Sequence, residues 1–353
     1  MRAKALLWAA VGAIILAALA PATAAPRFTV TDLGVLGGWG SGASAINARD
    51  VVVGSSTTGE PGSFAEPMRH AFLWRSGKMI DLGTLGGKFS GALDINDKDQ
   101  VVGSSHLAGV MARSQAFIWR AGKMTRPSGI PKEAMHSSAC GINDRGQVAG
   151  DYWVHEKRGG QGYAFRWQDG KLTLLGKGSA NGINNKGQVI GRRAGFARLW
   201  TSGKAVDLGV PSGSGWIWSE PSAINEDGTV VGTAARKTRP PEFIRHAVIW
   251  RRGKVSVLPT LGGKGGGASG INNRGQVVGS SETGDHESRA FLFQDGAMFD
   301  LNTCIPPGSG WVLGTATAIN DRGQIVGSGS HGRRGRAFLL TPVTDASPSR
   351  KAR

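Results

Sequence analysis

A repeated phrase constrains the fold of this chain more than any other feature of its sequence. Each copy contains Ile-Asn, a short turn, a Val-Val-Gly-like strand, an Ala-Phe-x-Trp-like strand and, in most copies, Asp-Leu-Gly. Successive copies are 41 to 49 residues apart, a period typical of propellers and solenoids, in which each unit packs mainly on its neighbours. The Ile-Asn pairs are Ile46-Asn47, Ile95-Asn96, Ile142-Asn143, Ile183-Asn184, Ile224-Asn225, Ile271-Asn272 and Ile319-Asn320.

Each copy predicts two β-hairpins. The first turn follows Ile-Asn, as in Asn143-Asp144-Arg145-Gly146, where Asn opens a type I turn and Gly supplies the positive φ that closes it. Asp50 and Asp99 replace this Gly in the first two copies, and Asp tolerates the same conformation. The second turn, as in Arg75-Ser76-Gly77-Lys78, joins the Ala-Phe-x-Trp strand to the next. Two hairpins give four antiparallel strands, which is one propeller blade.

The two ends of the repeat region predict how the array closes. The strand from Phe28 to Gly34 has no hairpin partner, and neither has Ala337-Phe338-Leu339-Leu340. If they pair, they complete a seventh blade and remove an exposed edge. The sequence therefore predicts an all-β, seven-bladed β-propeller over residues 25–343, with an open β-solenoid as the alternative. We expect the strand ending in Ile-Asn to be innermost, because the residue before Ile is Ala or Gly in every copy except at Asp94.

These segments resemble the HAF repeat family, named for a triplet that occurs here as His70-Ala71-Phe72 and, altered, as His246-Ala247-Val248. The resemblance covers about Phe28 to Val343 and rests on several copies of Asp-Leu-Gly-Thr-Leu-Gly-Gly-like and Ile-Asn-Asp-x-Gly-Gln-Val-Val-Gly-like segments. It implies a secreted or cell-envelope repeat protein, and it brings no established activity and no catalytic residues.

The N-terminus predicts export. Arg2 and Lys4 precede an apolar run, and the small-residue site Ala22-Thr23-Ala24 follows, as in a signal peptide of residues 1–24. An uncleaved anchor is the alternative, but the run is shorter than the roughly 20 residues that a spanning helix needs. We therefore expect a periplasmic or extracellular protein with no later membrane segment, ending in a basic, disordered tail of residues 344–353. Cys140 and Cys304 are expected to remain thiols because they lie about half a ring apart.

The excess of basic residues indicates anionic partners. Loss of Arg2 and Lys4 with the signal peptide would lower the formal charge from +17 to +15, which still favours anionic polysaccharides or envelope surfaces. The basic residues are spread over both faces of the expected ring rather than gathered in one stripe, which argues against a nucleic-acid site. Those in the variable loops, which we take as binding candidates, are Arg192, Arg193, Arg236, Lys237, Arg239, Arg333 and Arg334.

Aromatic residues supply the second set of candidates. Five of the eleven Trp residues recur at one strand position and are expected to pack between blades: Trp74, Trp119, Trp167, Trp200 and Trp250. The other five Trp residues outside the signal peptide, together with Tyr152, lie mostly in predicted loops on the face that carries the variable loops. There they either form flat platforms for sugar rings or plug the loops. These candidates are Trp39, Tyr152, Trp153, Trp216, Trp218 and Trp311.

The leading functional hypothesis is a non-catalytic, monomeric protein that binds an anionic glycan with its variable-loop face. The sequence has no nucleophile elbow, metalloprotease helix or phosphate loop, and it indicates no metal and no cofactor. A carbohydrate-active hydrolase or lyase is the alternative, because carboxylates from different blades can pair at a channel mouth. A protein-binding adhesion or scaffolding module is the third reading. The acidic candidates for catalysis are Asp94, Asp151, Glu156 and Glu220.

Overall fold

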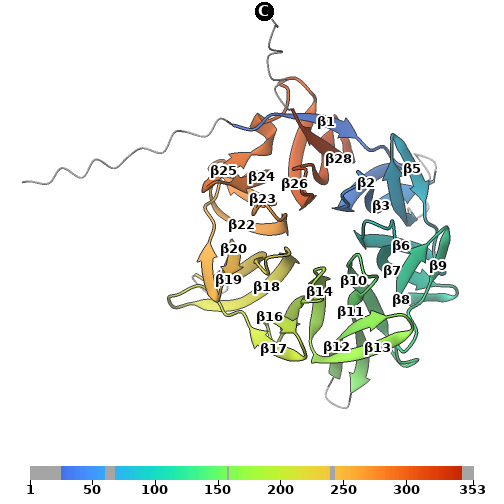
Figure 1. Cartoon of the computed structure of the whole chain (residues 1–353). Helices are drawn as coiled ribbons and strands as arrows, with labels where there is room; N and C mark the ends of the chain where they lie inside the picture. Colours follow the sequence, from blue (N-terminus) through green and yellow to red (C-terminus); the bar gives the residue numbers. More distant parts are fainter. Residues whose placement is uncertain (1–24, 60–67, 157–158, 239–242, 344–353) are drawn as a thin grey trace, which may run out of the picture.

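The computed structural model describes residues 25–59, 68–156, 159–238 and 243–343, and these form β-strands arranged in a ring (Figure 1). The innermost strands line a central channel. The predicted signal peptide and C-terminal tail lie outside these residues. Besides strands, the described part of the chain contains a short 3-10 helix, η1 (Leu301–Thr303). No helix in the described ranges is long and apolar enough to cross a membrane.

The strands form antiparallel units of four, which we call blades, and the chain runs outward through each blade from the channel. The inner strands are β2 (Gly37–Ile46), β6 (Gly86–Ile95), β10 (His136–Ile142), β14 (Ser179–Ile183), β18 (Trp216–Ile224), β22 (Gly262–Ile271) and β26 (Trp311–Ile319). The second strands are β3 (Val52–Thr58), β7 (Val101–Leu107), β11 (Val148–Glu156), β15 (Val189–Arg193), β19 (Val230–Lys237), β23 (Val277–Thr283) and β27 (Ile325–His331).

The outer half of each blade is a second hairpin. The third strands are β4 (Arg69–Arg75), β8 (Val110–Arg120), β12 (Gly159–Gln168), β16 (Phe196–Thr201), β20 (Phe243–Arg251), β24 (Ser288–Gln294) and β28 (Arg334–Pro342). The outer strands are β5 (Lys78–Asp81), β9 (Lys123–Thr125), β13 (Lys171–Lys177), β17 (Lys204–Asp207), β21 (Lys254–Val257), β25 (Ala297–Asp300) and β1 (Phe28–Asp32).

The ring closes as the sequence predicts. β1 pairs antiparallel with β28 from Phe28↔Pro342 to Asp32↔Phe338, so one sheet, β1-β28-β27-β26, contains both ends of the repeat region. Four further sheets have four strands, and an eight-stranded sheet joins β2–β5 to β6–β9 through one parallel pairing, Arg69↔Phe89. This closed arrangement of four-stranded antiparallel sheets is a β-propeller, not the open solenoid.

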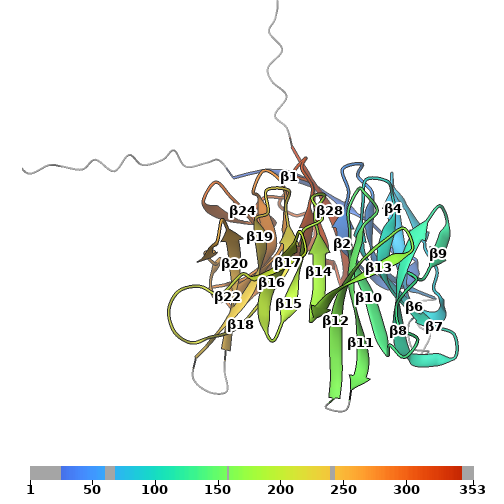
Figure 2. The same cartoon turned by 60° about the horizontal axis from the view of Figure 1, so that its bottom comes forward.

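The two ends of the blades form two different faces (Figure 2). The tight-turn face carries the turns after Ile-Asn, where Asp50 and Asp99 have φ values of 64° and 57° as expected. The variable-loop face carries the loops between second and third strands and the links between blades. The β11–β12 hairpin projects from this second face in Figure 2.

A ladder of asparagine side chains binds the inner ends of the blades to one another. The Asn of each Ile-Asn pair accepts hydrogen bonds from backbone N–H groups of its own turn, as Asn47 Oδ1 does from Arg49 and Val51. Its amide then donates to the backbone carbonyl of the equivalent Asn in the next blade, and Asn320 donates to Asn47 to complete the circle. The other donors, each to the next in chain order, are Asn47, Asn96, Asn143, Asn184, Asn225 and Asn272.

Candidate functional site

The central channel contains a cavity of about 350 Å³ toward the tight-turn face. All of the inner strands carry a β-bulge at the same position, as between Ala139 and Gly141 in β10. A bulge turns an additional side chain away from the regular pleat, and here each bulged residue lines the cavity. They are Ser44, Leu93, Cys140, Asn181, Ser222, Ser269 and Thr317.

Two of the acidic candidates lie near Cys140: Asp94 lines the cavity, and Asp151 lies on β11, the strand next outward. Asp94 accepts hydrogen bonds from the N–H groups of Ile142 (2.8 Å) and Ile95 (2.9 Å), yet burial raises the pKa of its carboxyl to about 7. Burial likewise raises the pKa of Asp151 to about 6. The pKa of the Cys140 thiol rises to about 12 through burial and the negative charges of Asp151 and Asp94, so this thiol is a poor nucleophile.

The raised pKa of Asp94 predicts a pH-dependent stability. Between about pH 4 and 7 the folded chain holds a proton that the unfolded chain releases, so stability falls as pH rises through this range. We expect Asp94→Asn to remove this dependence. The difference in the free energy of unfolding, variant minus wild type, should therefore increase from pH 4 to pH 8. The increase is at most about 4 kcal/mol, since each pKa unit corresponds to about 1.4 kcal/mol. Urea unfolding at both pH values measures the gain, and an equal difference at pH 4 and pH 8 would contradict it.

The four acidic candidates do not form one group. Glu220 contacts Asn181 at 3.5 Å and pairs with Arg192 at 3.7 Å, whereas Glu156 lies on the projecting β11–β12 hairpin beside the Tyr163 hydroxyl. Glu156 therefore does not lie with Asp94 on the cavity lining, because β11 extends beyond the ring at this point (Figure 2). Among the described residues, no cluster of three His, Cys, Asp or Glu side chains is placed to hold a metal ion.

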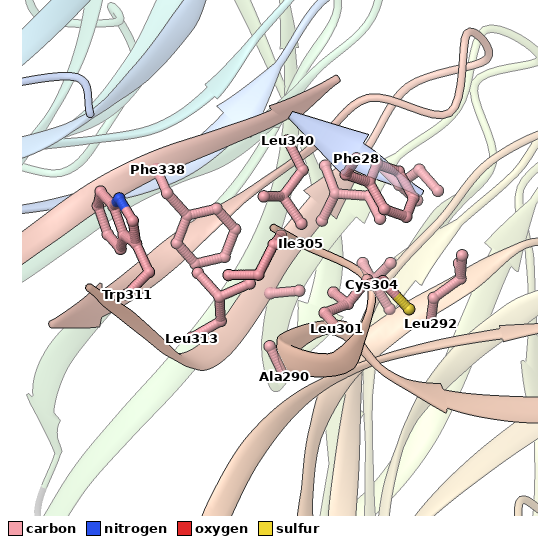
Figure 3. Packing of buried hydrophobic residues seen from close by; sticks show 14 residues of the cluster. Phe28, Ala290, Leu292, Leu301, Cys304, Ile305, Trp311, Leu313, Phe338 and Leu340 are labelled. Atoms are coloured by element: carbon pink, nitrogen blue, oxygen red, sulfur yellow. The ribbon is translucent and has the colours of Figure 1, made fainter. Parts of the chain in front are cut away.

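Two aromatic candidates are core residues. Trp311 is 9% exposed and stacks on His331 with ring centroids 4.9 Å apart; Figure 3 shows it beside Phe338 and Leu313. Tyr152, also 9% exposed, stacks against Tyr163 and Phe165. Neither ring presents a free face to a ligand, because neighbouring strands cover it.

Two other candidates are exposed but isolated from each other. Trp39 on β2 is 45% exposed and Trp153 on β11 is 44% exposed. The Trp153 ring lies over the backbone of Gly160 and Gly162, where a Cβ would come within 3.6 and 3.0 Å of it. The expected packing role of the repeated Trp residues is confirmed, since Trp74, Trp167, Trp200 and Trp250 are buried and Trp119 packs against a core cluster.

The remaining aromatic candidates gather with basic residues on one blade. The Arg245 guanidinium of β20 lies 5.9 Å from the centroid of the Trp218 ring and 5.7 Å from that of Phe243. Trp218 pairs with Ala235 and Ala235 with Arg245, so the small Ala side chain lets the guanidinium reach across β19. We call these residues, with Trp216, Arg236, Lys237 and His246, the β18–β20 surface.

The second side of this surface is also basic and aromatic. Trp216 meets His246 edge to face at 5.5 Å, and burial together with the charge of Arg236 lowers the pKa of His246. Arg236, Lys237 and Arg245 are exposed, and Phe243 is 45% exposed. A guanidinium between aromatic rings, with free cations beside it, can hold an anionic group and the flat apolar face of the same ligand.

The other basic candidates are only partly brought together. Arg192 and Arg193 end β15 and lie beside the β18–β20 surface through the Arg192–Glu220 ion pair. Arg333 and Arg334 are exposed on the closing blade, away from this surface, and Arg239 lies outside the described residues. The sequence did not predict Arg245 and Phe243 as part of this surface. Their position could have suggested it, because they precede the altered triplet residue Val248 by three and five residues.

Comparison with known proteins identifies the fold but no family. No family model and no curated protein sequence matches the chain. The β-propeller domain of the Trilobed protease from Pyrococcus furiosus is similar over 86% of this chain and 98% of that domain, with 12% identity and a TM-score of 0.54. At this identity the likeness shows the β-propeller fold alone.

Two peptidases also contain a similar structure. Pyrococcus horikoshii acylaminoacyl peptidase matches 87% of this chain with 11% identity, and a Mycobacterium tuberculosis puromycin-hydrolyzing peptidase matches 89% with 12% identity, each with a TM-score of 0.54. The chain spans about half the length of these two proteins, 54% and 55%. Their activities therefore do not transfer with the fold.

Proposed function

We propose that this chain is an exported, non-catalytic, seven-bladed propeller that binds an anionic glycan through the β18–β20 surface. The count of seven takes the eight-stranded sheet as two blades joined by one pairing. Membership of the HAF repeat family, removal of residues 1–24 and a monomeric state are parts of the same proposal, and they rest on the sequence.

The contacts of Arg245 with the rings of Trp218 and Phe243 are the observation that carries this proposal. Aromatic rings offer the flat apolar area on which a sugar ring stacks, and Arg245 places a delocalised cation 5.9 and 5.7 Å from the centroids of two of them. Arg236 and Lys237 add positive charge without an ion pair in the described part of the chain. An acidic polysaccharide satisfies both features, because its sugar rings have an apolar C–H face and its repeating units carry carboxylate or sulfate groups.

A polyuronate titration tests the proposal. We expect saturable binding of a polyuronate but not of neutral dextran, with affinity falling as salt rises. Trp218→Ala and Arg245→Ala should each weaken binding about tenfold, equivalent to about 1.4 kcal/mol. Calorimetry at two salt concentrations measures these changes, and product analysis of the same mixtures shows whether the polymer is cleaved.

Two variants provide matched controls. Trp39→Ala removes an exposed Trp from another blade, and Lys204→Ala removes one exposed positive charge at the β16–β17 turn. Equal weakening by all four variants would reduce the binding to diffuse attraction and sink the proposal. Cleavage of the polymer would replace it with the hydrolase or lyase reading. No polyuronate binding at physiological salt would also overturn it and direct the search to protein partners.

A further inference from the structure

The channel has a chemistry opposite to that of the rest of the molecule. The chain carries 42 Lys and Arg against 25 Asp and Glu, yet the ionisable side chains lining the cavity are five carboxyl groups and the Cys140 thiol. The remaining polar lining consists of hydroxyl and amide groups. The five carboxyl groups belong to Asp94, Asp97, Asp144, Glu226 and Asp321.

These carboxyl groups are held in place without being neutralised. Four lie at the position after the ladder Asn and accept the backbone N–H of the preceding blade, as Asp144 does from Asp97 and Asp321 does from Asn273, each at 2.8 Å. None of the five forms an ion pair with a described Lys, Arg or His. The second oxygen of Asp97, and that of Glu226, therefore remains available to a donor at the mouth.

The deeper wall of the cavity also offers free hydrogen-bonding groups. The bulged Ser44, Ser222 and Ser269 point hydroxyls into the channel, and these make no hydrogen bond within the described ranges. The Oδ1 atom of Asn181, the bulged residue of β14, is buried and has no hydrogen-bond partner among the described residues. A buried acceptor without a donor costs about 1–3 kcal/mol, so a ligand N–H that reaches Asn181 would recover part of that cost.

We propose that the channel binds a protonated oligoamine, a ligand class distinct from the anionic glycan of the β18–β20 surface. Carboxylates at the mouth hold one ammonium group, while the Ser hydroxyls and Asn181 accept from the part of the chain inside the cavity. The carboxylates come from different blades and face the axis from different sides. This spacing suits a ligand with several separated N–H groups, whereas a single divalent cation needs oxygen ligands converging at about 2.0–2.6 Å.

Positive charge around the channel mouth means that attraction at long range cannot account for binding of the oligoamine. The turn residues next outward are mainly basic, including Arg49, Arg145 and Arg322, so the long-range field of this face repels a cation. Binding must therefore come from short contacts inside the rim. Removing the carboxylates that line the cavity should therefore lower the affinity for the oligoamine strongly. Removing acidic groups elsewhere on the same face should change that affinity little.

Spermidine titration by calorimetry tests this, using residues 25–353 at pH 7.5 and low salt. We expect one saturable site, and the double variant Asp97→Asn/Glu226→Gln, which neutralises the two carboxyl groups that keep a free oxygen, should weaken binding at least tenfold. An amide is compatible with the ladder at this position, because Asn185 and Asn273 occupy it in two blades and accept the same backbone hydrogen bond. The single variants Asp97→Asn and Glu226→Gln should each weaken binding in the same direction.

The matched control is Asp169→Asn/Asp295→Asn, which removes two carboxylates from outer turns of the same face. Both residues have positive φ values, 46° and 52°, which Asn tolerates. This control and Trp218→Ala should leave spermidine binding within twofold of wild type. Absence of a saturable site, equal weakening by both double variants, or Mg²⁺ binding in place of spermidine would overturn the proposal. None of these outcomes alters the polyuronate test, because the two sites lie on opposite faces.

Discussion

Gly103→Ala should lower the free energy of unfolding by about 3 kcal/mol, at the upper end of the range for overpacking. Gly103 is the Gly of a Val-Val-Gly strand and pairs with Ala92 on the bulged inner strand. A Cβ at this position would lie 2.0 Å from the carbonyl oxygen of Gly91 and 2.9 Å from the ring of Phe117. The backbone cannot yield without breaking the bulge. Urea unfolding measures the loss.

Gly91→Ala is the matched control, because Gly91 lies on the facing strand and a Cβ there meets no atom within 4 Å. Both substitutions remove the same unfolded-state entropy, so the difference between them isolates the steric effect. We expect Gly91→Ala to change stability by no more than about 0.5 kcal/mol. Similar losses in both variants would show that strand propensity, and not close contact, explains the Gly of the repeat.

Much of the blade is visible in the sequence because local chemistry sets it. Turn residues, strand lengths and the unpaired terminal strands predict antiparallel units and their closure by β1 and β28. The bulge is less visible, because neighbouring blades cover both faces of each sheet. Phe72 and Leu73 are adjacent in β4 and both buried, so burial does not follow the alternation of a strand here. Gly103, which pairs with Ala92, leaves the space that the bulge needs.

The Asn ladder could not be predicted from the repeat alone. Asn47 and Asn96 each look like ordinary turn residues, and their hydrogen bond joins positions 49 apart in the sequence. It forms only because the closed ring places equivalent turns side by side. The same ring brings Asp97 and Asp321 to one channel mouth, so the acidic rim is a property of the assembly of blades rather than of any single repeat.

The candidate binding surface depends on more than the presence of aromatic residues near the variable loops. Trp218 and Trp311 are both on inner strands near the variable-loop face, but only Trp218 is opposite a small residue that lets a cation reach its ring. Trp311 instead stacks on His331 and joins the core. Whether each Trp contacts a cation or packs in the core depends on the residues that face it on the adjacent strands. A single sequence does not show which residues these are.

Phe28→Ala should lower the free energy of unfolding by about 3–5 kcal/mol, the usual cost of emptying a buried Phe site. Phe28 begins the closing strand and is 3% exposed, and Figure 3 shows its ring beside Leu340 in the cluster that joins the last blades. Its backbone N–H also donates to the carbonyl of Cys304 at 2.8 Å. Loss of the side chain leaves β1 attached to the ring mainly by its pairing with β28.

Thr29→Ala separates side-chain packing from strand pairing, because Thr29 is the next residue of β1 and is exposed. We expect this control to lie within about 0.5 kcal/mol of wild type, with the same dependence of unfolding on urea. Limited proteolysis should cut Phe28→Ala near residue 30 faster than Thr29→Ala, since an edge strand that detaches exposes its backbone. A loss below about 1 kcal/mol for Phe28→Ala, with unchanged proteolysis, would mean that pairing alone closes the ring.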